Sequence, residues 1–306
     1  MRVLFAGSPD VALPSLTALL ESPSQVVGVL TQPPRPVGRK RVVTPTAVGA
    51  FAAEHGLPVA TPRDSAEIIV AVREWEPEIA IVVAYGRLLT AEVLDTVPNG
   101  WWNVHFSLLP RWRGAAPVPH AILAGDHTTG ISIFRIDEGL DTGDVALQVE
   151  HPIATGVSAT ELLDELSHLA VEPLLNFLQK SKMGPVPVVA QHGTPSSAGK
   201  PGVDFGELDW REDALALFRR IRAANAEPGA FTSRRDTGQR VLIHNAAETE
   251  GEAPLRPGEL HTVDGRVLVG TGSDPLELGL VQPSGKKVMA ARDWFRGLPL
   301  GVSFGE

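Results

Sequence analysis

Cysteine is absent from all 306 residues of the sequence. This absence excludes disulfide crosslinks, thiol nucleophiles and thiolate metal sites, so side-chain chemistry has to come from His, Asp, Asn or Ser. Long apolar runs are absent as well, because no stretch reaches the ~20 residues that a membrane span needs. The opening apolar residues give way at once to Gly-Ser-Pro-Asp, which leaves no signal-peptide core. We therefore expect a cytoplasmic protein.

Positive charge is scarce overall, and the formal net charge is −9. A protein that coats nucleic acid without specificity is disfavoured, because phosphate affinity depends on clustered Lys and Arg. With 43% hydrophobic and 21% charged residues, the chain has the composition of a folded protein with a substantial core. At this length two domains are expected, with one large α/β domain as the alternative.

Residues 1–190 alternate short apolar runs with helical patterns. The alternation predicts βαβ units and a doubly wound, mainly parallel, Rossmann-like sheet with helices on both faces. The expected strands are Arg2–Ala6, Val26–Thr31, Ile79–Ala84, Trp102–His105 and Gly130–Ile136. The expected helices are Pro9–Leu20, Pro45–His55, Ser65–Trp75 and Pro117–Ala124, then a long helix over Ser158–Lys182 with a kink at Pro173.

The last third of the chain has a different pattern. Residues 191–206 are too poor in apolar side chains to pack as an element, so they are expected to form a linker. Residues 207–306 begin with a helical pattern over Arg211–Asn225. Short strand patterns follow, separated by Gly and Asp turns, over Arg240–Asn245, Arg266–Gly270 and Leu276–Gln282. These elements predict a small OB-like β-barrel as the second domain.

Asn103 and His105 stand two residues apart at the end of a predicted strand. Their side chains therefore point to the same face, at the edge of the sheet where doubly wound folds bind ligands. An amide donor beside a titratable imidazole suits the stabilisation of an oxyanion. The pair alone is weak, because an arbitrary Asn-x-His is more often two satisfied polar residues at a strand end.

A second unusual segment is the acidic loop over residues 137–144. Gly139 and Gly143 allow the backbone to come close to a ligand, and Asp141 offers a carboxylate. An ordinary hairpin turn is the alternative here. Neither segment alone indicates a catalytic site, but the two together do.

Asn-x-His-x-Ser-Leu-Leu-Pro at 103–110, joined to the later Leu-Asp-x-Gly at 140–143, resembles the signature of the formyltransferase family that uses 10-formyltetrahydrofolate. The resemblance implies that Asn103, His105 and Asp141 are the catalytic residues. It also implies that the folate is bound by two segments, comprising Ser107, Leu108, Leu109 and Pro110, and Tyr85, Gly86, Leu88 and Leu89.

Within this family, Ser-Leu-Leu-Pro-Arg-Trp-Arg-Gly-Ala-Ala-Pro-Val at 107–118 resembles the branch that acts on methionyl-tRNA, not the purine-biosynthetic branch. Segments at 208–210, 228–230 and 281–297 resemble the OB-like second domain of that branch. The resemblance thus covers nearly the whole chain. One departure is the segment 222–228, where Ala224-Asn225-Ala226-Glu227 replaces an aromatic and apolar pattern and alters packing at the domain junction.

This resemblance implies transfer of a formyl group from 10-formyltetrahydrofolate, as co-substrate, to the amino group of methionyl initiator tRNA. Asn103 and His105 are expected to hold the oxyanion. Asp141 is expected to orient and charge the imidazole, or to relay protons through water. No metal, membrane or obligate protein partner is expected, and the histidines show no metal-ligand spacing such as His-x-x-x-His.

A basic segment, Arg35-Pro-Val-Gly-Arg39-Lys40-Arg41, is expected to be a loop because of its glycine and proline. Its four charges suit contact with phosphate or a splayed acceptor end, although a solvated basic loop is the alternative. The resemblance implies a tRNA-contacting insertion here. On the second domain a further set of basic residues could follow the acceptor stem: Arg219, Arg220, Arg222, Arg234, Arg235, Arg240, Lys286 and Lys287.

Three other functions remain open at this point. The first is another enzyme with the same formyl donor, acting on a sugar nucleotide, a purine precursor or water. The second is an RNA-binding module without activity, in which the first domain is a scaffold. The third is a nucleotide-binding oxidoreductase, which is disfavoured because Ala6-Gly7-Ser8-Pro9 lacks the Gly-x-Gly-x-x-Gly pattern.

Overall fold

The computed structural model describes residues 1–38, 41–225 and 228–305. The chain forms two compact units. The first comprises Met1–Pro117, Thr128–Pro152 and Leu163–Gly199, and the second comprises Val118–His127, Ile153–Leu162 and Lys200–Glu306. The domain limits expected from the sequence stay a prediction. Within the described ranges, none of the helices has the length and apolar character needed to cross a membrane.

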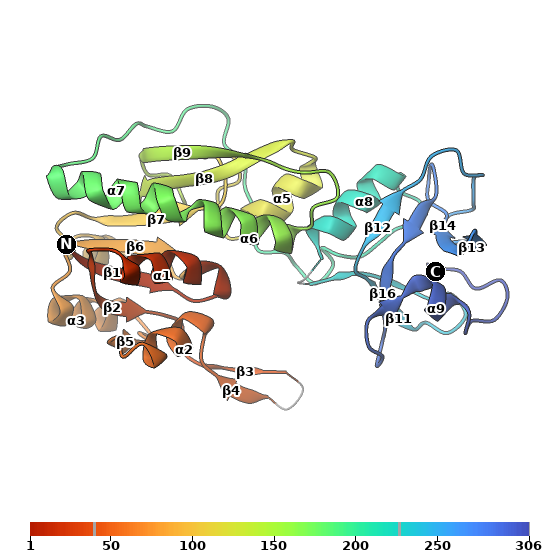
Figure 1. Cartoon of the computed structure of the whole chain (residues 1–306), viewed down its shortest axis with the longest axis horizontal. Coiled ribbons are helices and arrows are strands. Elements are labelled where there is room, and N and C mark those ends of the chain that lie inside the picture. The colour runs from red at the N-terminus through yellow and green to blue at the C-terminus, as the bar shows by residue number, and fades with distance from the viewer. Residues whose placement is uncertain (39–40, 226–227, 306) are drawn as a thin grey trace. The chain divides into compact units, whose positions relative to one another are not determined.

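A seven-stranded sheet organises the first unit (Figure 1). The strands are β1 (Arg2–Gly7), β2 (Gln25–Leu30), β5 (Val59–Ala60), β6 (Ile79–Val83), β7 (Trp101–His105), β8 (Thr128–Arg135) and β9 (Val145–Pro152). Their order is β5-β2-β1-β6-β7-β8-β9, parallel as far as β7, with β8 and β9 antiparallel. The expected mainly parallel sheet is confirmed. The strands predicted for this unit are present to within two residues at either end.

The two faces of this sheet have separate apolar layers. On one face, Leu4, Ala6 and Trp101 belong to a buried cluster with side chains of the helices α3 (Ser65–Trp75) and α4 (Ala91–Leu94). On the other face, Trp102 packs against Phe177 of α7 (Val171–Met183) with ring centroids 4.7 Å apart. Alternate residues of one strand therefore serve opposite layers, as in any sheet that is covered on both sides.

The helices follow the capping signals of the sequence. Thr46 and Asp64 cap α2 and α3, because each side chain accepts a hydrogen bond from the backbone N–H three residues later. The helical elements are the short 3-10 helix η1 (Asp10–Ala12), α1 (Leu13–Glu21), α2 (Ala47–Glu54), α3 (Ser65–Trp75), α4 (Ala91–Leu94), α5 (Pro117–Ala124), α6 (Ala159–Leu169), α7 (Val171–Met183), α8 (Ala214–Ala223) and α9 (Ala291–Phe295). The shortest strands and α4 have too few residues for a periodic pattern, so the sequence does not predict them.

The single long helix expected over Ser158–Lys182 is wrong. The chain forms two helices there, α6 and α7, which are separated at Ala170. Pro173 explains the break, because it has no N–H to bond the carbonyl of Leu169 and its ring would clash with that group. The proline thus stands in the first turn of a new helix, where it is tolerated.

The second unit contains two antiparallel sheets around one apolar core (Figure 1). One sheet has the order β10 (Ala230–Ser233), β11 (Arg240–Ile243), β16 (Leu280–Pro283) and β17 (Met289–Ala290). The other has the order β12 (Ala246–Glu248), β15 (Leu276–Leu278), β14 (Arg266–Val269) and β13 (Leu260–Val263). Phe304 lies in the core, stacked against both Trp210 and Trp294. This architecture is the expected small OB-like β-barrel.

One strand expected over Leu276–Gln282 is wrong, because β15 and β16 belong to different sheets. The chain changes sheet at Gly279. A Cβ at this position would lie 2.3 Å from Oδ1 of Asn245, whose side chain accepts a hydrogen bond from the Leu280 N–H. Only glycine leaves room for that turn-stabilising contact.

Candidate active site

Asn103 and His105 lie at the carboxyl end of β7, on the face of the sheet that also carries Trp101. Here β7 pairs in parallel with β6 and in antiparallel with β8, so strand direction reverses next to the two residues. Asn103 is half-buried, and its side chain makes no hydrogen bond to any residue that the structure describes. Its amide is therefore available to a ligand.

The His105 ring is held in one orientation. Its Nε2 lies 2.9 Å from the carbonyl oxygen of Trp112, which can only accept, so Nε2 carries the proton. Phe134 meets the ring edge-on. Burial lowers the pKa of His105 below its ordinary value of 6.5, while the Asp141 carboxylate and the Trp112 carbonyl oppose that change. The neutral imidazole therefore presents an unprotonated Nδ1.

Asp141 comes to this same atom from a different loop. Its Oδ2 lies 3.9 Å from Nδ1 of His105 and accepts a hydrogen bond of 2.7 Å from the Gly114 N–H. Both side chains are largely shielded from water. The expected proximity of His105 and Asp141 is thus present, although the two residues stand 36 positions apart in the chain.

Backbone strain surrounds this pair. Asp141 has φ of 53° and Trp112, whose carbonyl holds His105, has φ of 60°. A non-glycine residue in the left-handed region costs on the order of 1 kcal/mol, and such residues persist where the surrounding structure fixes them. Gly143 allows the loop to pass β8, since a Cβ there would lie 1.7 Å from the Arg135 carbonyl oxygen.

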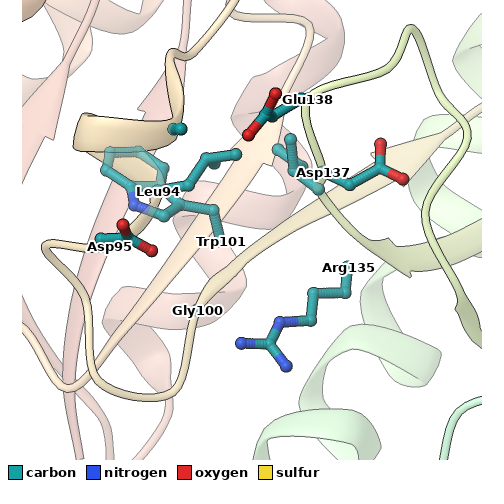
Figure 2. A pocket seen from close by; sticks show the side chains of 9 residues that line it. Leu94, Asp95, Gly100, Trp101, Arg135, Asp137 and Glu138 are labelled. Atoms are coloured by element: carbon teal, nitrogen blue, oxygen red, sulfur yellow. The ribbon is translucent and has the colours of Figure 1, made fainter.

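A cavity of about 240 Å³ lies on the Trp101 side of the sheet. Figure 2 shows Trp101 and Leu94 on one part of its lining and Asp137 and Glu138 on another, with Arg135 farther along the strand. The same loop that carries Asp137 and Glu138 carries Asp141. Four of the nine lining residues are charged, and Gly100 and Arg135 place the cavity at the amino end of β7, opposite to the end that carries His105.

Comparison with known proteins decides the class. Residues 1–178 match the model of the family described as "Formyl transferase", and residues 203–299 match "Formyl transferase, C-terminal domain". The chain belongs to the formyl transferase family. It is therefore an enzyme of one-carbon group transfer.

Relatives within the formyl transferase family match over almost the entire chain. The methionyl-tRNA formyltransferase of Arthrobacter sp. (strain FB24) is 48% identical over 299 residues, covering 97% of each chain. That of Renibacterium salmoninarum is 45% identical over 309 residues and covers 100% of each. Among solved structures, the methionyl-tRNA formyltransferase from Clostridium thermocellum has a TM-score of 0.59 at 18% identity, with 82% of this chain and 95% of that chain covered. HypX from Aquifex aeolicus has a TM-score of 0.69 at 19% identity over 98% of this chain, which spans 48% of HypX.

The residues expected to bind folate in this formyl transferase occupy two kinds of position. Ser107 is fully buried, and its hydroxyl donates a hydrogen bond to the Arg111 carbonyl. Tyr85 and Leu89 are also buried, in the layer against α3 and α4. Leu88 is 77% exposed. The remaining four are exposed Gly86, half-buried Leu108 packed against Gly130, and buried Leu109 and Pro110.

Ser132 and Gln148 hold the segment 107–110 from the two antiparallel strands, and the sequence patterns do not point to them. The Ser132 hydroxyl donates to the Ser107 carbonyl and accepts from the Leu109 N–H. Gln148 donates from Nε2 to both the Leu109 carbonyl and the Ser132 hydroxyl. A lone serine inside the apolar run Ile-Ser-Ile-Phe is the signal that could have identified this network.

The basic segment Arg35–Arg41 begins with β3 (Arg35–Val37), which pairs antiparallel with β4 (Val42–Thr44) just beyond the segment. The expectation of a loop is therefore wrong for residues 35–37. β-branched residues on both sides of the Gly38 turn favour strand pairing over an irregular loop. Arg35 and Arg41 are exposed. The predicted contacts of Arg39 and Lys40 lie outside the described residues.

Most of the basic residues proposed for the second unit are engaged within the protein. Arg220 pairs with Glu212 and Arg234 with Asp236. A third, Arg222, donates hydrogen bonds to two backbone carbonyls, those of Val157 and Ala154. The Arg240 guanidinium lies 3.5 Å from the centre of the Phe231 ring. Lys286 and Lys287, by contrast, are exposed in the turn after β16.

Proposed function

We infer that this chain transfers the formyl group of 10-formyltetrahydrofolate to the free amino group of methionyl initiator tRNA. The observation that carries this inference is the approach of the Asp141 carboxylate to Nδ1 of His105 at 3.9 Å, in a chain 48% identical to a methionyl-tRNA formyltransferase. The residues proposed as catalytic are Asn103, His105 and Asp141. The product is N-formylmethionyl-tRNA, which serves translation initiation in the cytoplasm.

The reaction needs one proton to change places. The methionyl nitrogen attacks the formyl carbon, a tetrahedral oxyanion forms, and the bond from that carbon to the folate nitrogen breaks. The attacking nitrogen loses one proton overall and the departing nitrogen gains one. A neutral imidazole with a free Nδ1 suits this exchange, since it can accept the first proton and return it to the leaving group.

The hydrogen bond from Nε2 to Trp112 changes the role that the sequence indicated for His105. A neutral ring with its proton on Nε2 has no donor left at Nδ1, so it cannot hold the oxyanion while it acts as a base. In this proposal Asn103 alone of the pair donates to the oxyanion. The Asp141 carboxylate then stabilises the imidazolium that forms during proton transfer.

The folate is proposed to bind at the carboxyl end of β7, beside Asn103 and His105, because this is the end of the sheet at which doubly wound folds bind ligands. Gly86 and Leu88 offer exposed surface on the segment that precedes α4. The other proposed folate-binding residues are buried or half-buried and would hold the site in place: Tyr85, Leu89, Ser107, Leu108, Leu109 and Pro110. The chemistry proposed here assigns no step to a metal, and no three His, Asp or Glu side chains gather as a metal site in the described residues.

Initiator tRNA is proposed to contact the basic segment of the sequence through Arg35, Arg39, Lys40 and Arg41. The exposure of Arg35 and Arg41 supports this assignment. The same proposal takes residues 1–190 as the catalytic domain, 191–206 as a linker and 207–306 as a tRNA-binding domain.

A formylation assay with radiolabelled donor tests the function directly. The acceptors to compare are methionyl initiator tRNA, methionyl elongator tRNA, an amino-sugar nucleotide, glycinamide ribonucleotide and water. Preferential formylation of the initiator tRNA is expected. Transfer to another acceptor at a higher kcat/KM, or release of formate alone, would overturn the inference.

A further inference from the structure

Gln191 joins two segments of the active site, although it lies in the stretch expected to be a linker. Its Oε1 accepts from Nε and Nη2 of Arg113, at 3.1 and 2.7 Å. Its Nε2 donates to the backbone carbonyls of Asp141 and Gly143, both at 2.8 Å. The Gln191 amide thus accepts two hydrogen bonds and donates two. It connects the loop that carries Asp141 with the segment 112–116, which begins with Trp112.

The neighbouring residues strengthen the same connection. The Ser196 hydroxyl accepts from the Trp112 N–H at 2.9 Å, and the Arg113 N–H donates to the Ser196 carbonyl. Ala198 makes two backbone hydrogen bonds with the segment, one with Arg113 and one with Ala116. Residues 191–198 therefore run along the segment whose Trp112 carbonyl orients His105.

We propose that Gln191 is a positioning residue that sets the Asp141 carboxylate against His105. The proposal rests on the proposed function of that pair. Gln191 bonds to neither reacting side chain: it fixes the backbone of the loop at Asp141, which adopts the left-handed conformation, and at Gly143.

The physical reason is the strain in this loop. The backbone conformation of Asp141 is intrinsically unfavourable, and its carboxylate is anchored on the other side by the Gly114 N–H. Without the two bonds from Gln191, the loop can relax to a more common conformation and the carboxylate moves away from Nδ1. Displacements of about 1 Å in a catalytic group can lower rates by on the order of 10²-fold.

Two substitutions distinguish the role of the amide oxygen, which binds Arg113, from that of the amide nitrogen, which binds the loop. Gln191→Met keeps the length of the side chain but removes every hydrogen bond. Gln191→Glu keeps an acceptor for Arg113 and removes the two donors to the loop. His192→Ala is the matched control, because His192 is the exposed neighbour in the same segment.

For both Gln191 variants we expect kcat to fall at least tenfold, while KM for donor and acceptor changes less than twofold and the thermal midpoint stays near that of the wild type. In Gln191→Met, which adds no charge, the acid limb of the pH profile should also shift to lower pH, because a displaced Asp141 no longer raises the pKa of His105. Asp141 is the charged residue that acts on His105, and Arg111 and Arg113 are the charged neighbours of Trp112 in the sequence. A partly unfolded enzyme would lose activity without any shift in that limb.

Wild-type kcat in Gln191→Glu would overturn the proposal, because the donors to the loop would then be dispensable. An equal loss in His192→Ala would also overturn it, since the effect would belong to the whole segment. The His105→Ala variant keeps the two hypotheses apart. If it retains turnover, the proposed mechanism fails; if it is inactive while Gln191→Met is normal, only the positioning role fails.

Discussion

The end of β7 and the surface of the second unit use polar residues in opposite ways. At the end of β7, Nδ1 of His105 and the side-chain amide of Asn103 make no hydrogen bond to any described residue. In the second unit, arginines that look available in the sequence are bound to partners, as with Arg220 and Glu212. A residue type in the sequence therefore does not reveal whether its functional atoms are free.

The difference has an electrostatic origin. A buried polar group is normally satisfied, so a side chain that keeps a free atom in a shielded site carries an energetic cost. The half-buried Arg220 and Arg234 avoid that cost, because each guanidinium is paired with a nearby carboxylate. The residues at the end of β7 thus keep atoms that can act on a substrate, whereas the paired arginines of the second unit have a structural role.

The largest expected effect comes from substitution of the proposed catalytic residues His105 and Asp141. His105→Ala and Asp141→Asn should each lower kcat by about 10²–10⁴, the range for a positioned acid–base group. Folate affinity should stay close to wild type in both variants. The thermal midpoint should be kept in Asp141→Asn but lowered in His105→Ala, which leaves a cavity beside Phe134. Initial rates at saturating substrate measure kcat, a folate titration measures the affinity, and thermal denaturation gives the midpoint. Near-normal turnover in His105→Ala would show that the free Nδ1 is not used.

Gly114→Ala tests how strictly the backbone holds the pair. Gly114 has φ of +122°, and a Cβ there would lie 2.6 Å from the Ala198 carbonyl oxygen. The variant should lose more than about 1 kcal/mol of stability, since alanine does not fit that conformation. Turnover should fall as well, because the N–H that binds Asp141 moves. Gly199→Ala, with open space around the new Cβ, is the control and should be neutral in both denaturation and activity assays.

The burial of His105 should be visible in the pH dependence of the reaction. Only neutral His105 accepts the proton, and burial lowers its pKa, so kcat should fall as the pH drops through a value below 6.5. Beneath that midpoint, kcat should decline by close to tenfold per pH unit. Initial rates measured across the acid range at saturating substrate concentrations give this profile without the titration of the free methionyl amine. An acid limb above pH 7 would contradict the buried, neutral imidazole.

The smallest effect concerns free and paired charge in the second unit. Replacement of exposed Lys286 and Lys287 with alanine should raise KM for tRNA and reduce the magnitude of the salt slope by roughly 0.7–0.9 for each phosphate that is no longer neutralised. Arg234→Ala should instead lower the thermal midpoint and leave that slope unchanged, since Arg234 is paired with Asp236. Equal salt slopes in the lysine variant and in Arg234→Ala would show that exposed and paired charges do not differ in tRNA binding.

Some features of the fold are accessible from the sequence because they depend on local patterns. The apolar runs of the parallel sheet are buried on two faces, and such runs are conspicuous in a sequence. The strands β12 and β17 have three residues or fewer, so no periodicity can identify them. The division of Leu276–Gln282 between two sheets depends on Asn245, which is 34 residues from Gly279 and leaves no local signal.

Local patterns were enough to specify the mainly parallel sheet, the second β-domain and the two segments that carry Asn103, His105 and Asp141, because periodicity and spacing can be followed along the chain. Which nitrogen of His105 is free, and that Gln191 spans the two segments, became visible in the folded chain alone. Those features depend on backbone carbonyls and N–H groups, which nearly every residue type possesses. Their positions follow from the fold and not from the identity of any nearby residue.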